Sequence, residues 1–192
     1  MQGPARVLEP EDVRLLLKHV LHYRYPTRNR TIVLLSFKAG LRACEIAGLE
    51  WHMVLRPDGR VADQLCIGRH IAKMGSARRI PVHPDLAAEL AALNSEQGLP
   101  RTGPVIGSER GGHMTARSIV NWFREVYADL DYIGCSSHSG RRTFITRSAR
   151  LLSQSGGSLR DVQELAGHRS LTTTERYIAG DREAQRKLVS LV

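Results

Sequence analysis

Four short stretches of this chain carry side chains that together could break and remake a phosphodiester bond. Arginine keeps its proton at neutral pH and binds two phosphate oxygens at a time, so a pair of arginines suits a phosphate that gains negative charge during a reaction. An imidazole can donate to a nonbridging oxygen or accept a proton, a lysine can protonate a departing oxygen, and a tyrosine can attack phosphorus to form a covalent ester. The stretches contribute Arg42, Lys73, His138, Arg141, His168 and Tyr177.

Two of the stretches place these side chains at helical spacing. In "AGLRACEIAGLEW", Glu45 follows Arg42 by three residues, so an ion pair between them would hold the guanidinium in place. In "SHSGRRTF", His138 and Arg141 are one turn apart and share a face at the start of a helix. Considered alone, either pair could also be an ordinary solvated helix feature, because such pairs are common and weak.

The other two stretches supply a lysine and a tyrosine. "AKMGSARRIPV" places Lys73 beside a glycine turn, and this is the only lysine between residues 38 and 187. "LAGHRSLTTTERYIAG" places Tyr177 nine residues after His168. A lone tyrosine is most often core filler, but the phosphate-binding partners in the other stretches favour a nucleophile. We expect no metal and no other cofactor, because cationic side chains replace a metal's charge and no carboxylates cluster at ligand spacing.

The composition indicates an anionic partner. There are 28 Lys and Arg against 19 Asp and Glu, a net charge of +9, which favours binding to nucleic acid or to a membrane surface over a merely solubilising role. The three cysteines are widely spaced and form no CxxC pair, so neither a disulfide framework nor a zinc site is indicated. No apolar run approaches membrane-spanning length and no signal peptide opens the chain, so we expect a soluble, intracellular protein.

The hydrophobic periodicity predicts one domain, residues 1–192, that is mostly helical. A small antiparallel sheet is expected after the third helix. Two of its three strands would lie in 52–68, joined by a turn at Pro57-Asp58-Gly59, and the third would lie in 77–83. We expect 153–158, "SQSGGS", to be a flexible break. The expected helices cover 9–22, 28–40, 42–51, 84–94, 116–130, 139–152, 159–167, 171–180 and 182–192.

The same stretches, in this order, resemble the motifs of the tyrosine recombinase (phage integrase) family. "GLRACEIAGLEW" is similar to the motif of the family's first arginine, "HSGRRTF" to its H-x-x-R-[HR]-[TS] box, and "LAGHRSLTTTERYI" to its L-G-H-x-x-x-x-T-T-x-x-Y box. "KMGSARRIPV" resembles the family's hairpin pattern K-x-G-x-x-R-x-[IV]-P. The resemblance covers the chain from about Arg6 to Leu188. One box alone would be a weak signal, but all of them in order are a strong one.

The resemblance implies a role for each candidate residue. Arg42 and Arg141 match the two catalytic arginines, and Tyr177 matches the nucleophile. His138 and His168 match the histidines of the second and third boxes. Lys73 matches the hairpin lysine, which we expect to be the general acid.

The chain also departs from the family pattern in three ways. The separation of Arg141 and His168, 27 residues, is slightly long, and Arg142 stands where many members have histidine. Most members carry an N-terminal DNA-clamping domain, whereas the catalytic-type sequence begins here almost at Met1. We therefore expect either a minimal member of the family or a trimmed chain.

The resemblance implies an α+β fold, the mostly helical tyrosine-recombinase catalytic domain with a small three-stranded antiparallel sheet. It implies site-specific recombination of double-stranded DNA through a 3′-phosphotyrosyl intermediate, without metal or ATP. The chain would be a monomer when free and a tetramer on paired DNA sites, with the terminal "KLVSLV" docking on a neighbour. Its expected place is the cytoplasm of a bacterium, at the nucleoid, encoded by a chromosome, phage or plasmid. Two alternatives remain: a DNA-binding member without strand exchange, and a type IB topoisomerase-like nicking and relaxing enzyme.

Overall fold

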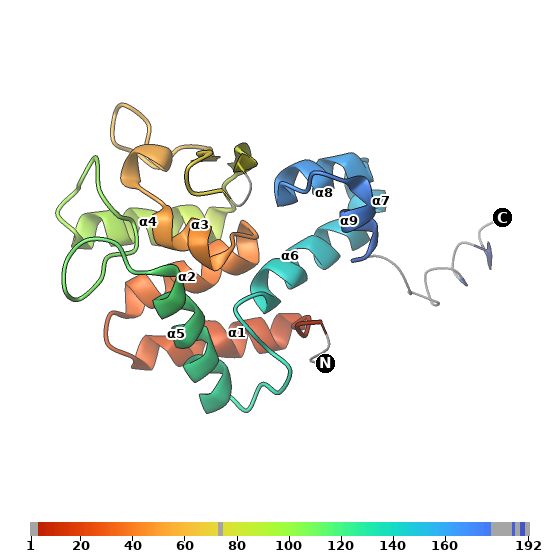
Figure 1. The fold of residues 1–192 in the computed structure, drawn as a ribbon, viewed down its shortest axis with the longest axis horizontal. Coiled ribbons are helices and arrows are strands. Elements are labelled where there is room, and N and C mark those ends of the chain that lie inside the picture. Colours follow the sequence, from red (N-terminus) through yellow and green to blue (C-terminus); the bar gives the residue numbers. More distant parts are fainter. Residues whose placement is uncertain (1–3, 73–74, 178–185, 187–188, 191–192) are drawn as a thin grey trace.

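The computed structural model describes residues 4–72, 75–177, 186 and 189–190 (Figure 1). They form a mostly helical fold with a small antiparallel sheet, as expected. In chain order the elements are α1 (Pro10–His19), the 3-10 turn η1 (Val20–His22), α2 (Pro26–Lys38), α3 (Ala43–Gly48), the 3-10 turn η2 (Trp51–Met53), β1 (Gln64–Ile67), β2 (Arg78–Pro81), α4 (Pro84–Glu96), α5 (Ala116–Asp129), α6 (Ser139–Arg150), α7 (Leu152–Ser155), α8 (Leu159–Ala166) and α9 (Leu171–Glu175).

The helix starts follow local sequence signals. Pro10, Pro26 and Pro84 each occupy the first position of a helix, where the missing N–H costs nothing and the fixed φ suits the turn. Thr115 caps α5 as expected, its hydroxyl accepting from the backbone N–H of Ser118 at 3.0 Å. These signals are local, and the sequence placed the starts of α1, α4 and α5 to within one residue, whereas α2 begins two residues before the expected position 28.

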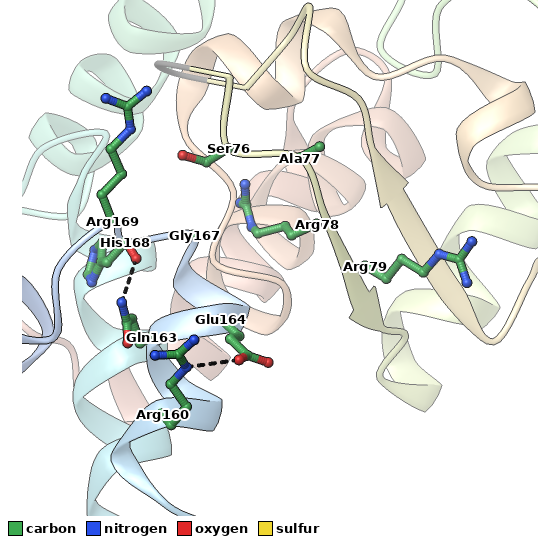
Figure 2. Close-up of a pocket in the computed structure, with 10 residues that line it drawn as sticks. All are labelled: Ser76, Ala77, Arg78, Arg79, Arg160, Gln163, Glu164, Gly167, His168 and Arg169. Carbon is green, nitrogen blue, oxygen red and sulfur yellow. Dashed lines mark hydrogen bonds and ion pairs between the residues drawn. The ribbon is translucent and has the colours of Figure 1, made fainter.

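The sheet consists of β1 and β2, paired antiparallel with Ile67 opposite Arg78. Strand β2 contacts α8, and Figure 2 shows the two elements facing each other across a pocket. Strand β2 therefore lies next to the helix that leads to His168.

The expected third strand is absent from the described residues. The stretch before the Pro57-Asp58-Gly59 turn is the 3-10 turn η2, followed by a single isolated bridge between Leu55 and Val61. The reason is burial: Met53 and Val54 are adjacent in sequence and are both inside the core. A strand with one solvated face would point them in opposite directions, whereas a helical turn can bury both.

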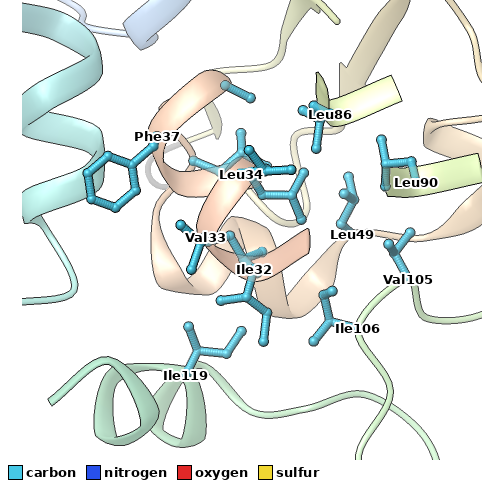
Figure 3. Close-up of a cluster of buried hydrophobic side chains, with 14 of the residues drawn as sticks. Ile32, Val33, Leu34, Phe37, Leu49, Leu86, Leu90, Val105, Ile106 and Ile119 are labelled. Atoms are coloured by element: carbon cyan, nitrogen blue, oxygen red, sulfur yellow. The ribbon is translucent and has the colours of Figure 1, made fainter. Parts of the chain in front are cut away.

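Helix α2 lies at the centre of the main core. Every residue from Thr31 to Phe37 is buried, as expected for a helix that is apolar on all sides, and α2 contacts α3, α4 and α6. Figure 3 shows its side chains meeting Leu86 and Leu90 of α4 and Ile119 of α5. This packing gives the functional residues near α2 a rigid support.

A second, smaller hydrophobic cluster joins α6 to α8. It consists of buried Ile145, Val162 and Ala166, and Phe144 and Tyr177 are packed against it. In Figure 1, α6 extends from the main body toward α8 and α9. The C-terminal part of the described chain is thus attached through α6, the helix that carries Arg141.

The break expected at 153–158 is partly wrong, because α7 occupies its first half. Leu152 packs against the second cluster, which explains the extra turn, and Gly156 at φ 67° ends it. Most of the helix expected at 182–192, with the "KLVSLV" segment, lies outside the described residues. No helix in the described part of the chain is long and apolar enough to cross a membrane.

Candidate active site

Arg42 is held at the start of α3 by the carboxylate of Glu45. The backbone N–H of Arg42 donates to Glu45 Oε2 at 2.9 Å, and its Nη1 donates to Oε1 at 3.1 Å. The carboxylate thereby satisfies a backbone donor that the helix itself leaves without a partner. The expected i,i+3 ion pair is confirmed. The Arg42 side chain is 17% exposed, so it lies at an accessible edge of the cluster.

Glu45 itself is fully buried and has a second partner, Arg78 of β2. Arg78 Nη1 and Nη2 donate to the two carboxylate oxygens at 2.8 and 2.9 Å, a bidentate fork. Burial raises the pKa of Glu45, but the hydrogen bonds and charge of Arg78, followed by those of Arg42, outweigh it and leave the pKa below its ordinary value. The carboxylate is therefore ionised at neutral pH.

Arg141 joins two segments that are distant in sequence. Its Nη1 donates to the carbonyl of Gly40 at 2.7 Å, and its Nη2 donates to the carbonyl of Ala166, the last residue of α8. The close packing of α6 on α2 depends on Gly140, where a Cβ atom would lie 2.2 Å from Ser36 Oγ. The glycine before Arg141 thus lets the helix start close enough for the guanidinium to reach Gly40.

This buried cluster of side chains carries a net positive charge. Burial and the neighbouring charge of Arg42 lower the pKa of Arg141 to about 10, which still leaves it charged at neutral pH. Three guanidiniums, those of Arg42, Arg78 and Arg141, then face the single carboxylate of Glu45. The excess of two positive charges has no counterpart among these side chains, so an anion of two negative charges would neutralise it.

His168 lies beside this cluster in its neutral form. Its Nδ1 is 2.9 Å from the hydroxyl of Thr174, which is fully buried. Burial, and then the charges of Arg141, Arg42 and Arg78, lower its pKa to about 4. A neutral imidazole with one nitrogen fixed by Thr174 can donate to, or accept from, a ligand through the other nitrogen.

Tyr177 follows α9 and is stacked on His168. The two ring centroids are 5.6 Å apart with an angle of 23° between the ring planes, and the Cζ atom of Arg142 lies 5.5 Å from the tyrosine ring centroid. The tyrosine also packs on the second hydrophobic cluster and is half-buried. The phenol oxygen lies close enough to Arg141 that a negative charge on it would stabilise the protonated guanidinium.

The structure therefore brings four of the six candidate residues into one network: Arg42, Arg141, His168 and Tyr177. His138 is the exposed residue that precedes α6, three positions before Arg141. Lys73 lies outside the described residues. The pocket of Figure 2, about 580 Å³, opens beside the network between β2 and the end of α8. In the described part of the chain no three His, Cys, Asp or Glu side chains are grouped to hold a metal ion.

Comparison with known proteins gives a family for this arrangement. The sequence model of the phage integrase family matches residues 6–184. The chain belongs to this family. Tyrosine recombinase XerC of Nitrobacter winogradskyi is 33% identical over 160 residues, 81% of this chain and 47% of that protein. XerC of Myxococcus xanthus is 31% identical over 190 residues, 89% of this chain and 54% of that protein. The chain thus spans about half the length of the curated relatives it matches.

Solved structures of the family share the fold. XerA recombinase superposes over 100% of this chain and 64% of its own, with a TM-score of 0.75 and 18% identity. XerH recombinase, solved bound to its difH substrate, superposes over 99% of this chain and 55% of its own, with a TM-score of 0.71 and 19% identity. The integrase of mycobacterium phage Brujita is 28% identical, with a TM-score of 0.58 over 96% of this chain and 57% of its own.

Two residues of this phage integrase family member were not singled out from the sequence. Arg78 appeared only as a letter of the hairpin pattern, and its partner Glu45 is 33 positions away, a distance that helical spacing cannot relate. Thr174 is one of three consecutive threonines, and nothing in the sequence distinguishes the one that meets His168. Both are buried polar groups, which need partners, and that requirement becomes visible only in the fold.

The lowered pKa of His168 predicts how the stability of this family member depends on pH. Between the ordinary pKa of 6.5 and the folded value of about 4, the unfolded chain binds a proton that the folded chain does not. The folded state should therefore lose stability as the pH falls through this window, and His168→Gln should flatten the loss. We expect the difference in Tm between pH 7 and pH 4.5 to be smaller in His168→Gln than in the wild type. The exposed His22→Gln variant serves as the control, and an equal loss in all three proteins would contradict a neutral His168.

Proposed function

We propose that this chain is the catalytic domain, residues 1–192, of a site-specific DNA recombinase that cuts and rejoins DNA through Tyr177. The observation that carries the proposal is the convergence of Arg42, Arg141, His168 and Tyr177, from segments up to 135 residues apart, in a network with two unbalanced positive charges. A phosphodiester has one negative charge and gains a second as a nucleophile adds, so the charge of this network suits the transition state better than the ground state.

The reaction follows from the groups present. The oxygen of Tyr177 forms a bond to phosphorus, the bond from phosphorus to the 5′-oxygen breaks, and the strand is left as a 3′-phosphotyrosyl ester. The phenol gives up its proton to a base, a role open to neutral His168, and the departing oxygen takes one from an acid, which we assign to Lys73. Arg42 and Arg141 hold the nonbridging oxygens, and His138 donates to one of them.

Rejoining reverses these steps. A 5′-hydroxyl of the partner duplex attacks the phosphotyrosyl ester and releases the phenol, so the bond energy is conserved and neither ATP nor a metal ion is needed. We propose double-stranded DNA as the partner. The net charge of +9 supports this, as does the fact that the related XerH site-specific recombinase was solved bound to its difH substrate.

We further propose that the chain is a monomer when free and assembles as a tetramer on two DNA sites, in the cytoplasm at the nucleoid. Strand exchange requires a second cut duplex to supply the attacking hydroxyl, so at least two active protomers must meet. The basic charge suits a compartment where DNA is the abundant polyanion.

The test is covalent capture. The chain is incubated, in excess EDTA, with a pool of duplexes of randomised sequence that carry breaks at scattered positions in one strand. When the chain cuts close to a break, the short released strand diffuses away. The 5′-hydroxyl that would reverse the reaction leaves with it, so the covalent adduct accumulates. We expect an adduct that survives denaturation, and sequencing of the captured DNA identifies the preferred duplex. DNA binding without any adduct would favour a member that lacks strand exchange, whereas relaxation of plasmids of any sequence would favour a topoisomerase-like enzyme.

A further inference from the structure

Arg78 links three of the segments that build the candidate active site. It belongs to β2, its fork binds Glu45 of α3, and its Nε donates to the carbonyl of Leu165 near the end of α8 at 2.9 Å. Its side chain is only 5% exposed. Figure 2 shows Arg78 pointing into the pocket toward α8, while Arg79 points away on the other side of the strand. One guanidinium therefore joins the hairpin, the Arg42 helix and the helix before His168.

The hydrogen bonds of Glu45 are divided between Arg78 and Arg42. Arg78 binds both carboxylate oxygens through its fork, and Arg42 binds the same two oxygens through its backbone N–H and its Nη1. The fork of Arg78 fixes the plane of the carboxylate, and that plane determines where the Arg42 guanidinium lies. Arg78 thus acts on Arg42 through the Glu45 carboxylate that the two arginines share.

The end of α8 is held in a similar way. The last carbonyl groups of a helix lack partners within it and carry its partial negative charge. At α8 the carbonyls of Leu165 and Ala166 accept from Arg78 and Arg141, respectively. His168 follows two residues after Ala166, so these two arginines together set the position of the imidazole.

Two simpler roles for Arg78 fit less well. A phosphate contact is disfavoured because the Glu45 carboxylate already binds and neutralises the fork of Arg78, whereas Arg141 donates only to neutral carbonyl groups. A purely stabilising role is disfavoured because a buried ion pair contributes little net stability compared with apolar residues of the same size. What a buried bidentate pair does supply is a fixed geometry.

We propose that Arg78 is a positioning residue that holds Arg42 against the reacting phosphate through Glu45 and keeps α8, with His168, in register. The inference rests on the proposed function, since it assigns Arg78 a part in the same reaction. Arg78→Lys keeps the charge but loses the fork. A displacement of the Arg42 guanidinium on the order of 1 Å corresponds to a loss of about 10²-fold in the rate of adduct formation.

The experiment measures single-turnover adduct formation by the full chain on the captured duplex, with DNA affinity and Tm measured in parallel. We expect Arg78→Lys to slow adduct formation about 10²-fold while DNA affinity is unchanged. Arg79→Lys, at the adjacent exposed position, should behave as the wild type. An Arg78→Lys rate equal to the wild-type rate would overturn the proposal.

A second substrate separates positioning from a general defect of folding. Replacing one nonbridging oxygen of the reacting phosphate with a methyl group removes the negative charge that Arg42 stabilises. If Arg78 acts through Arg42, the defect of Arg78→Lys should largely disappear on at least one diastereomer of this methylphosphonate duplex, as should the defect of Arg42→Ala. A defect of equal size on both substrates would overturn the proposal.

A double variant covers the case in which Arg78→Lys does not fold. Arg78→Met combined with Glu45→Gln removes both buried charges together, so the fold should be retained. This variant should also be slow on the phosphate and recover on the methylphosphonate, and the absence of either effect counts against positioning. If the wild-type chain forms no adduct on either substrate, the proposed function fails first and the inference fails with it.

Discussion

Tyr177→Phe is expected to form no covalent adduct with DNA while binding DNA as tightly as the wild type. The phenol oxygen forms the bond to phosphorus, but it contributes little to binding in the ground state. The phenylalanine ring keeps the stacking on His168 and the contact with Arg142, so the geometry of the site should be preserved. The measurement is a denaturing gel of the capture reaction, with a mobility-shift titration on the same protein.

Tyr132→Phe is the matched control for this variant. The Tyr132 hydroxyl donates to the carbonyl of Asp12 at 3.0 Å, and the Arg6 guanidinium lies over its ring, so its contacts are structural. Tyr127 is almost fully buried in the main core, and its burial raises its pKa further above the ordinary value. We therefore expect Tyr132→Phe to form the adduct. An adduct that persists in Tyr177→Phe would show that the nucleophile is a different residue.

Lys73→Ala should slow cleavage by about 10²–10⁴-fold, the usual effect of removing a general acid. The departing 5′-alkoxide is strongly basic and needs a proton as its bond breaks. Arg42 and Arg141 are bound to protein carbonyl or carboxylate oxygens through their N–H groups and suit charge stabilisation. A lysine beside several cations has a pKa below its usual 10.4 and can release its proton more readily.

A sulfur substrate isolates the role of Lys73. Replacing the bridging 5′-oxygen with sulfur creates a leaving group that departs as a thiolate and needs no proton. Lys73→Ala should therefore recover most of its cleavage rate on this duplex, while Lys18→Ala, at an exposed position of α1, should match the wild type on both substrates. Without recovery on sulfur, Lys73 would be a phosphate-binding or surface residue, and His138 or His168 would be the next acid to test.

The sequence and the structure agree best where the signal is local. Helices α1, α4 and α5 were predictable because apolar residues recur along them with a period near 3.6 and a proline or Thr115 marks the start of each. The pairing of Arg42 with Glu45 was also predictable from local spacing, since Glu45 is three positions after Arg42. The six candidate residues were found through short motifs, each contained in a dozen or so residues.

The differences arise where distant segments meet. The third strand was expected from the apolar residues before Pro57, yet the core buries Met53 and Val54 together, and a strand with one solvated face cannot do that. The fork of Arg78 on Glu45 joins residues 33 positions apart, and the bond of Arg141 to Gly40 joins residues 101 apart. No periodicity relates such pairs, so the network that surrounds the arginines could be read only from the fold.

The most direct measurement of the central claim is the chemical identity of the adduct. The captured complex, formed in excess EDTA, is digested with nuclease and protease, and the modified peptide is sequenced by mass spectrometry. We predict one nucleotide joined through its 3′-phosphate to the oxygen of Tyr177, with a free 5′-hydroxyl on the released strand. A nucleotide on another residue, a 5′-phosphate linkage, or strand cleavage that requires a metal and leaves no adduct would contradict the account.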